Sequence, residues 1–191
     1  ILFFLFILKT NIAYSLIEVD ITRGNLDPLP IAVSPLFLEK KDKNEFAKLL
    51  NLEDLGIEIS EVIENNLKKT GLFNTLGRDA FLQKPDIAHL KPRFEDWTLI
   101  KAQALITGKV SLKKDKLKVE FRLWDVLNAK EMMALAFTTV PSNWRRVGHI
   151  ITDKVYQRLT GEKGYFDTRI IYVSEEGPKT QRIKKLAIMD Q

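Results

Sequence analysis

The chain of 191 residues is 45% hydrophobic and 29% charged, with a formal net charge of +5. This balance is typical of a folded globular protein and excludes extended disorder, and the length suffices for one domain of about 150 residues with additional segments. Because the sequence contains no cysteine, disulfides, thiol catalysis and thiolate metal sites are excluded.

An apolar run, ILFFLFIL, opens the chain and is too short to span a membrane, which takes about 20 apolar residues. Ala13 and Ser15 follow it as small residues two apart, the pattern of a signal-peptide cleavage site. We therefore predict a partial signal peptide over residues 1–15 and a mature chain that starts at Leu16. The alternative is a buried N-terminal core segment. Since an initiator Met and a basic region are missing, we expect the sequence to be truncated at its front.

The predicted mature chain begins with LIEVDIT, in which apolar and polar residues alternate with the period of a half-buried strand. Two interpretations stay open: an edge strand of the chain's own sheet, or a tail that pairs with the sheet edge of a partner. A stretch rich in Gly, Asn, Asp and Pro follows, so we expect a tail over residues 16–28. Its candidate partner-binding residues are Leu16, Ile17, Glu18, Val19, Asp20, Ile21 and Thr22.

The next part of the chain predicts one short strand and one long helix. IAVSPLFL is the strand candidate, and EKKDKNEFAK predicts a solvated loop or a short helical piece. Apolar residues at helical spacing predict a helix from about Asp54 to Lys69, which Gly71 ends. The Pro-containing connection after it is irregular, with one helical turn near residues 94–100.

Three successive strand patterns, QALITGKVSLKK, KLKVEFRLWDV and EMMALAFTTV, predict an antiparallel meander. In the second, alternation assigns Val119 and Phe121 to the core face and Lys118, Glu120 and Arg122 to the solvated face. The apolar run of the third strand predicts a more buried position.

A final helix is predicted from Pro141 and Ser142 to Gly161. One apolar stripe runs along it: Trp144, Val147, Ile151, Val155 and Leu159. The fold class is therefore an α+β (α/β) domain over residues 29–163, with a mixed or antiparallel sheet of about five strands and two main helices on one face. Residues 164–191 then predict a β-hairpin, which needs a sheet to receive it.

The sequence shows no catalytic chemistry, so we expect no enzyme, no cofactor and no metal site. His89 and His149 are isolated from each other and from metal-ligand spacings, and no nucleotide-binding or nucleophile motif occurs. Lysines line the meander's first turn, which raises RNA binding as an alternative. However, alternation places Phe121 on the apolar face, away from the lysines, and a solvated strand face is the better interpretation.

The stretch NWRRVGHIITDKVYQRLTGEKGYFDTRIIYV resembles the TolB family of the Tol-Pal system, as do PIAVSP, ALITGKV, VEFRLWDV and RIKKLAIMDQ. The resemblance covers essentially the whole chain. It implies an α/β N-terminal domain followed by a six-bladed β-propeller, of which residues 164–191 would be an incomplete first blade. We then expect Ile170 to Val173 and Leu186 to Met189 to be exposed, and deletion of residues 165–191 to improve solubility.

The resemblance also implies a periplasmic adaptor without enzymatic activity. Family members link the inner-membrane protein TolA to the lipoprotein Pal and support outer-membrane constriction at cell division and envelope integrity. Their first mature residues bind the C-terminal domain of TolA, a segment that corresponds by position to Leu16 through Thr22. Pal binding requires the full propeller. The alternatives are an RNA-binding module, suggested by the family's likeness to anticodon-binding domains, and a non-functional fragment of a disrupted gene.

Overall fold

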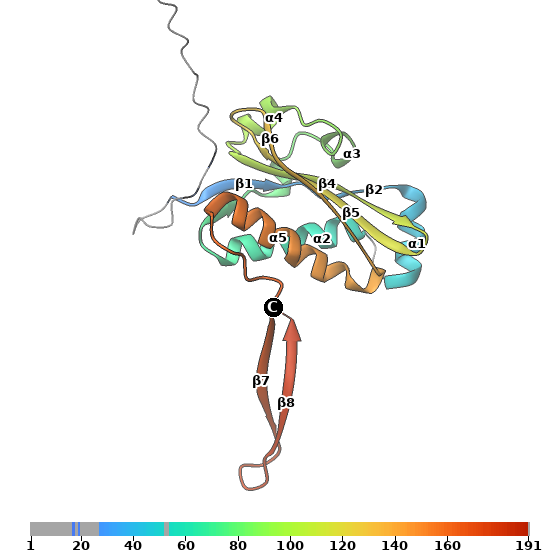
Figure 1. Ribbon diagram of the computed structural model, residues 1–191, viewed down its shortest axis with the longest axis vertical. Coiled ribbons are helices and arrows are strands. Elements are labelled where there is room, and N and C mark those ends of the chain that lie inside the picture. Colours follow the sequence, from blue (N-terminus) through green and yellow to red (C-terminus); the bar gives the residue numbers. More distant parts are fainter. Residues whose placement is uncertain (1–16, 18, 20–26, 52–53, 191) are drawn as a thin grey trace, which may run out of the picture.

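The computed structural model describes residue 17, residue 19, residues 27–51 and residues 54–190 (Figure 1). The predicted signal peptide and most of the predicted tail lie outside these residues. Among the residues described, no helix has the length and apolar character that crossing a membrane requires.

A mixed sheet in the order β3-β1-β4-β5-β6 forms the centre of the domain, and β2 also pairs with β4. Parallel pairing joins β1 to β3 and to β4, and β2 to β4, whereas β4, β5 and β6 form the predicted antiparallel meander. The strands are β1 (Leu29–Val33), β2 (Phe37–Leu38), β3 (Phe73–Thr75), β4 (Ala104–Lys113), β5 (Lys116–Asp125) and β6 (Lys130–Thr139). The predicted α+β class and mixed sheet are confirmed. The predicted strand IAVSPLFL is divided between β1 and β2, and β3 was not predicted.

Two long helices, α2 (Leu55–Lys69) and α5 (Trp144–Thr160), pack side by side on one face of the sheet (Figure 1). This is the predicted helical layer. The opposite face carries α3 (Pro85–Ala88) and α4 (Phe94–Leu99), the latter at the predicted helical turn. There Trp97, 1% exposed, packs into a smaller apolar cluster with residues of β1 and β4. Single 3-10 turns lie at Arg78–Ala80 and Pro141–Asn143.

Local signals in the sequence set the helix ends. The Asp54 carboxylate accepts hydrogen bonds from the N–H groups of Gly56 (3.0 Å) and Ile57 (3.3 Å), which satisfies two donors that a helix start leaves free. Gly71 (φ 72°) and Gly161 (φ 77°) adopt the left-handed conformation that stops α2 and α5, as predicted.

EKKDKNEFAK, predicted as a solvated loop or a short helical piece, takes the helical alternative: it lies in an 11-residue helix, α1 (Lys40–Leu50), whose Phe46 reaches the main core and is 1% exposed. Another predicted segment differs from the structure. The prediction that EMMALAFTTV is a more buried strand is wrong. This segment, β6, is the last strand of the sheet, and Leu135 is 39% exposed. The reason is its position at the edge of the sheet, where no described strand covers its outer side and which an apolar run in the sequence does not reveal.

The predicted alternation of β5 is confirmed, since Leu117, Val119, Phe121 and Leu123 are at most 1% exposed. The C-terminal hairpin, β7 (Arg169–Glu176) with β8 (Ile183–Asp190), forms a separate antiparallel sheet that extends away from the domain (Figure 1). Its apolar side chains are exposed as expected: Ile170, Ile171, Tyr172, Val173, Ile183, Leu186, Ile188 and Met189.

A buried polar contact joins the two long helices. The amide nitrogen of Asn66 on α2 lies 2.9 Å from Nδ1 of His149 on α5 and donates to Oγ1 of Thr152 at 3.3 Å. All three residues are at most 4% exposed. Because buried polar groups have lost their water, a hydrogen bond removed at this contact is not replaced by solvent.

We predict that Asn66→Ala lowers the free energy of unfolding by about 1–3 kcal/mol, since it removes a buried amide donor that contacts both His149 and Thr152. Urea denaturation followed by circular dichroism measures this change. Asn65→Ala is the matched control, because Asn65 is the exposed neighbour on the same helix and its loss should stay within about 0.5 kcal/mol. Equal losses for the two variants would contradict a structural role for the buried contact.

Candidate partner-binding site

Two of the seven predicted partner-binding residues are described by the structure, and both contact the chain's own domain. Val19 is 9% exposed, and its N–H donates to the backbone oxygen of Leu159 at 2.7 Å. Ile17 is partly buried against the same core cluster. The other five, Leu16, Glu18, Asp20, Ile21 and Thr22, lie outside the described residues. At Ile17 and Val19, therefore, the apolar positions of the alternating pattern face inward on this domain.

The acceptor for Val19 is one of the carbonyl groups that a helix leaves free at its end. Leu159 is in the last turn of α5, where backbone oxygens have no partner within the helix. Gly161 N–H satisfies the oxygen of Gln157, and Val19 satisfies that of Leu159.

The segment after α5 is fastened to the same helix, which the sequence pattern did not reveal. The carboxylate of Asp153 accepts from the N–H groups of Phe166 (2.7 Å) and Asp167 (3.1 Å). Arg146 and Asp167 form a two-point ion pair at 2.9 and 3.1 Å. Gly164 allows the close approach, because a Cβ there would lie 2.5 Å from Cα of Asp153. We name residues 164–168 the anchored linker.

Aromatic rings hold the anchored linker at the C-terminal half of α5. The ring of Tyr156 meets those of Tyr165 and Phe166 edge to face, with centroids 5.8 Å apart in each case, and that of Phe73 at 6.3 Å. Phe166 is 1% exposed. Burial raises the pKa of Tyr156 above its ordinary value. The C-terminal half of α5 thus contacts Val19 as well as the anchored linker.

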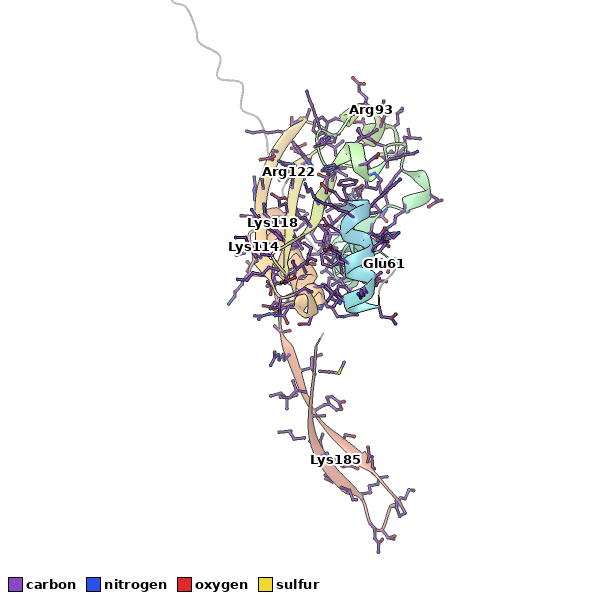
Figure 2. The ribbon with its side chains drawn as sticks, turned by 90° about the vertical axis from the view of Figure 1, so that its right-hand side faces the viewer. Glu61, Arg93, Lys114, Lys118, Arg122 and Lys185 are labelled. Carbon is purple, nitrogen blue, oxygen red and sulfur yellow. The ribbon has the colours of Figure 1, made fainter. Side chains whose placement is uncertain are left out.

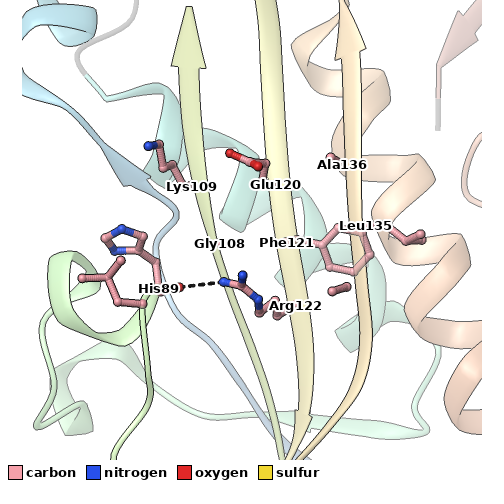
Figure 3. Close-up of a pocket in the computed structure, with 10 residues that line it drawn as sticks. His89, Gly108, Lys109, Glu120, Phe121, Arg122, Leu135 and Ala136 are labelled. Carbon is pink, nitrogen blue, oxygen red and sulfur yellow. Dashed lines mark hydrogen bonds between the residues drawn. The ribbon is translucent and has the colours of Figure 1, made fainter.

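A hollow of about 420 Å³ lies on the solvated face of the meander (Figure 3). Arg122 donates from Nη1 to the backbone oxygen of His89 at 3.0 Å, and the His89 ring stacks on Phe37 at 4.4 Å. Nδ1 of His89 lies 3.0 Å from the oxygen of Pro85, so the ring is held by structural contacts. Nothing in this hollow pairs a nucleophile with a base.

The lysines of the meander do not form a base-stacking surface. Figure 2 shows Lys114, Lys118 and Arg122 along the sheet. Lys118 pairs with Glu120 at 2.7 Å, which neutralises part of the charge, and Phe121 is 1% exposed and closed to a stacking base. Within the described part of the chain, no group of three His, Cys, Asp or Glu residues could hold a metal ion.

Comparison with known proteins places these features in a family context. A family model, the TolB amino-terminal domain, matches residues 17–132. The Tol-Pal system protein TolB of Pelagibacter ubique (strain HTCC1062) is 76% identical over 190 residues, which cover 100% of this chain and 43% of that relative. The crystal structure of TolB from Acinetobacter baumannii is similar in fold, with a TM-score of 0.66 and 20% identity, over 92% of this chain and 39% of that one. The chain thus spans less than half the length of these relatives.

The ion pair between Lys118 and Glu120 on β5 should affect the titration of the Glu120 carboxyl group. The hydrogen bond from Lys118 lowers the pKa of Glu120 below its ordinary value, so the pair contributes stability at neutral pH that is lost as the pH falls through this lowered pKa. Lys118→Met should raise the pKa of Glu120 toward its ordinary value, as followed by NMR titration of the carboxyl carbon. An unchanged pKa would show that Lys118 is not the cause.

The anchored linker predicts where the hairpin can be removed. A chain that ends at Thr168 keeps Phe166 buried, so it should retain its stability and gain solubility, because the exposed hairpin is absent. A chain that ends at Gly164 loses Phe166, and its free energy of unfolding should fall by about 3–5 kcal/mol, as for a buried Phe→Ala change.

Thermal and urea unfolding of the two truncated chains, beside the full chain, provide the measurement. Equal stability of the two truncated chains would contradict the anchoring role of Phe166. A loss of solubility on ending at Thr168 would mean that the hairpin packs on the domain in solution.

Proposed function

We propose, because this chain belongs to the TolB family, that it serves as a periplasmic, non-enzymatic adaptor module of the Tol-Pal system. Its binding element is the segment Leu16 to Thr22, and its partner is the C-terminal domain of a TolA-like protein. The observation that supports this proposal is that Ile17 and Val19 pack on the core cluster and Val19 bonds the end of α5, since an alternating segment with one apolar face suits docking against a surface.

The alternating pattern suits strand addition to a partner. In an extended segment, Ile17, Val19 and Ile21 share one face, and Glu18 and Asp20 share the other. Main-chain hydrogen bonds with a partner's sheet edge would supply affinity, and the apolar side chains would fill alternate pockets. The two carboxylates would then favour a basic partner surface and speed its association.

The partner has to compete with the chain's own domain. Burying a valine stabilises by about 1.5–3 kcal/mol, and a hydrogen bond such as the one to Leu159 adds about 0.5–1.5 kcal/mol. Release of Val19 therefore costs a few kcal/mol, and each 1.4 kcal/mol weakens the apparent affinity about tenfold. Partner binding would replace both contacts, because the segment provides the same backbone donors and the same apolar face.

The remaining assignments follow the family. Residues 16–28 act as the partner-binding tail, residues 29–163 as the α/β domain, and residues 164–191 as the opening strands of a propeller blade. Side chains exposed on both faces of the hairpin fit a strand pair that is packed between neighbouring blades. Binding of a Pal lipoprotein would require that whole propeller. Support for outer-membrane constriction and envelope integrity would come through these two partners.

We predict that a chain starting at Leu16 binds the C-terminal domain of a TolA-like partner, whereas a chain starting at Arg23 does not. Isothermal titration calorimetry measures the loss, which is expected because the main-chain donors and the three apolar residues are removed together.

The matched control is the Leu16 chain with Lys114, Lys116 and Lys118 changed to Gln. It should bind the partner like the parent chain, because these lysines lie outside the segment. Equal affinity of the Leu16 and Arg23 chains would reject the tail mechanism. Salt-dependent binding of an RNA oligonucleotide that the lysine variant loses would support the nucleic-acid alternative.

A further inference from the structure

The outer edge of β6 is an unprotected strand edge. Among the described residues, β6 is the terminal strand of the sheet and pairs only with β5, so one row of its backbone N–H and C=O groups faces outward. The strand is ten residues long, and Figure 3 shows Leu135 and Ala136 upon it. Its side chains from Lys130 to Thr139 are all exposed or half-buried.

Sheet edges usually carry features that discourage another strand: prolines, charges near the middle, or bulges. In β6 the two charged residues, Lys130 and Glu131, stand at its start, and the register shift opposite Leu123 and Trp124 lies at that same end. The stretch from Met132 to Thr139 is uncharged and contains no proline. The register shift falls on Met132, so the backbone is open to strand addition over about seven residues, from Met133 to Thr139.

Four of the charges beside this edge are paired with one another, and Lys130 stands at the end of the strand. Lys118 bonds Glu120 at 2.7 Å, and Arg122 bonds Glu131 at 3.2 Å. Along the stretch from Met132 to Thr139, an acidic or a basic peptide would thus find no charge to select it. This uncharged stretch instead tolerates its own copy, where like surfaces meet.

We propose that β6 pairs with β6 of a second copy of this chain in an antiparallel arrangement, which joins the two sheets into one. This interface uses neither the segment Leu16 to Thr22 nor the hairpin, so it is independent of the proposed binding of a TolA-like partner.

Antiparallel pairing centred on Leu135 or on Ala136 satisfies the geometry. Either register keeps the side-chain faces of the two sheets aligned, because side chains directly opposite each other point to the same face. Residues from Met133 to Phe137 then meet only uncharged residues of the other copy, and the two Lys130 residues lie at opposite ends of the interface. Leu135 and Phe137 extend the apolar helix-side face across the junction.

A single strand pair is a small interface, so the dimer should form and dissociate with concentration. We expect sedimentation equilibrium of the full chain, from about 10 µM to about 1 mM, to show a rising weight-average mass. Over the same range, hydrogen exchange at backbone amides between Met132 and Thr139 should slow at alternate positions, since only those amides face outward.

Ala136→Lys places two like charges at or beside the symmetry axis and should shift the dissociation constant upward by at least tenfold. The control is Asn65→Lys, which adds the same charge to the exposed side of α2 and should dimerise like the parent chain. A second variant, Ile171→Lys on the exposed hairpin, should also dimerise normally. Circular dichroism confirms that each variant is folded.

Any of three results would overturn the proposal. The first is a parent chain that stays monomeric up to about 1 mM. The second is equal dimerisation of the Ala136→Lys and Asn65→Lys variants, and the third is loss of the dimer in Ile171→Lys. The last result would assign the contact to the hairpin. None of these outcomes bears on the binding of a TolA-like partner, which is measured at concentrations where the chain is a monomer.

Discussion

The rest of this structure depends on the burial of one apolar stripe of side chains along the helix α5. Val147, Ile151, Val155 and Leu159 of α5 are at most 3% exposed, packed against the sheet and α2. Their spacing fixes the rotation of the helix, and so it fixes which backbone and polar groups face outward. Three of those groups hold the neighbouring segments: the Leu159 carbonyl, the Asp153 carboxylate and the Arg146 guanidinium.

Sequence patterns predicted the parts of the fold that depend on local periodicity. The stripe of α5, the alternation of β5, and the stop signals at Gly71 and Gly161 each involve residues within a few turns or strand positions. The position of a strand within the sheet cannot be predicted in this way, because it depends on which other strands pair with it. The apolar run of β6 therefore predicted burial, although no described strand covers its outer edge. The helix α1 likewise depends on a contact between residues far apart in the sequence, because its Phe46 packs into the main core.

In the candidate site, too, the sequence predicted the local features but not the contacts between distant residues. The period of two in LIEVDIT predicted that Ile17 and Val19 would share an apolar face, and both pack inward. No pattern could reveal that the surface beneath them is the end of α5, because Leu159 lies 140 residues further along the chain. The anchored linker was missed for a related reason. Gly164 and Asp167 read as loop residues until the helix places Asp153 beside them.

The anchored linker and the N-terminal residues 17 and 19 are held to the domain by different sets of contacts. The anchored linker combines a buried aromatic ring, two backbone hydrogen bonds and an ion pair, and these must break together for it to leave. The described contacts of the N-terminal segment are one backbone hydrogen bond and the apolar packing of Ile17 and Val19. The contacts described for the anchored linker are thus of more kinds than those described for residues 17 and 19.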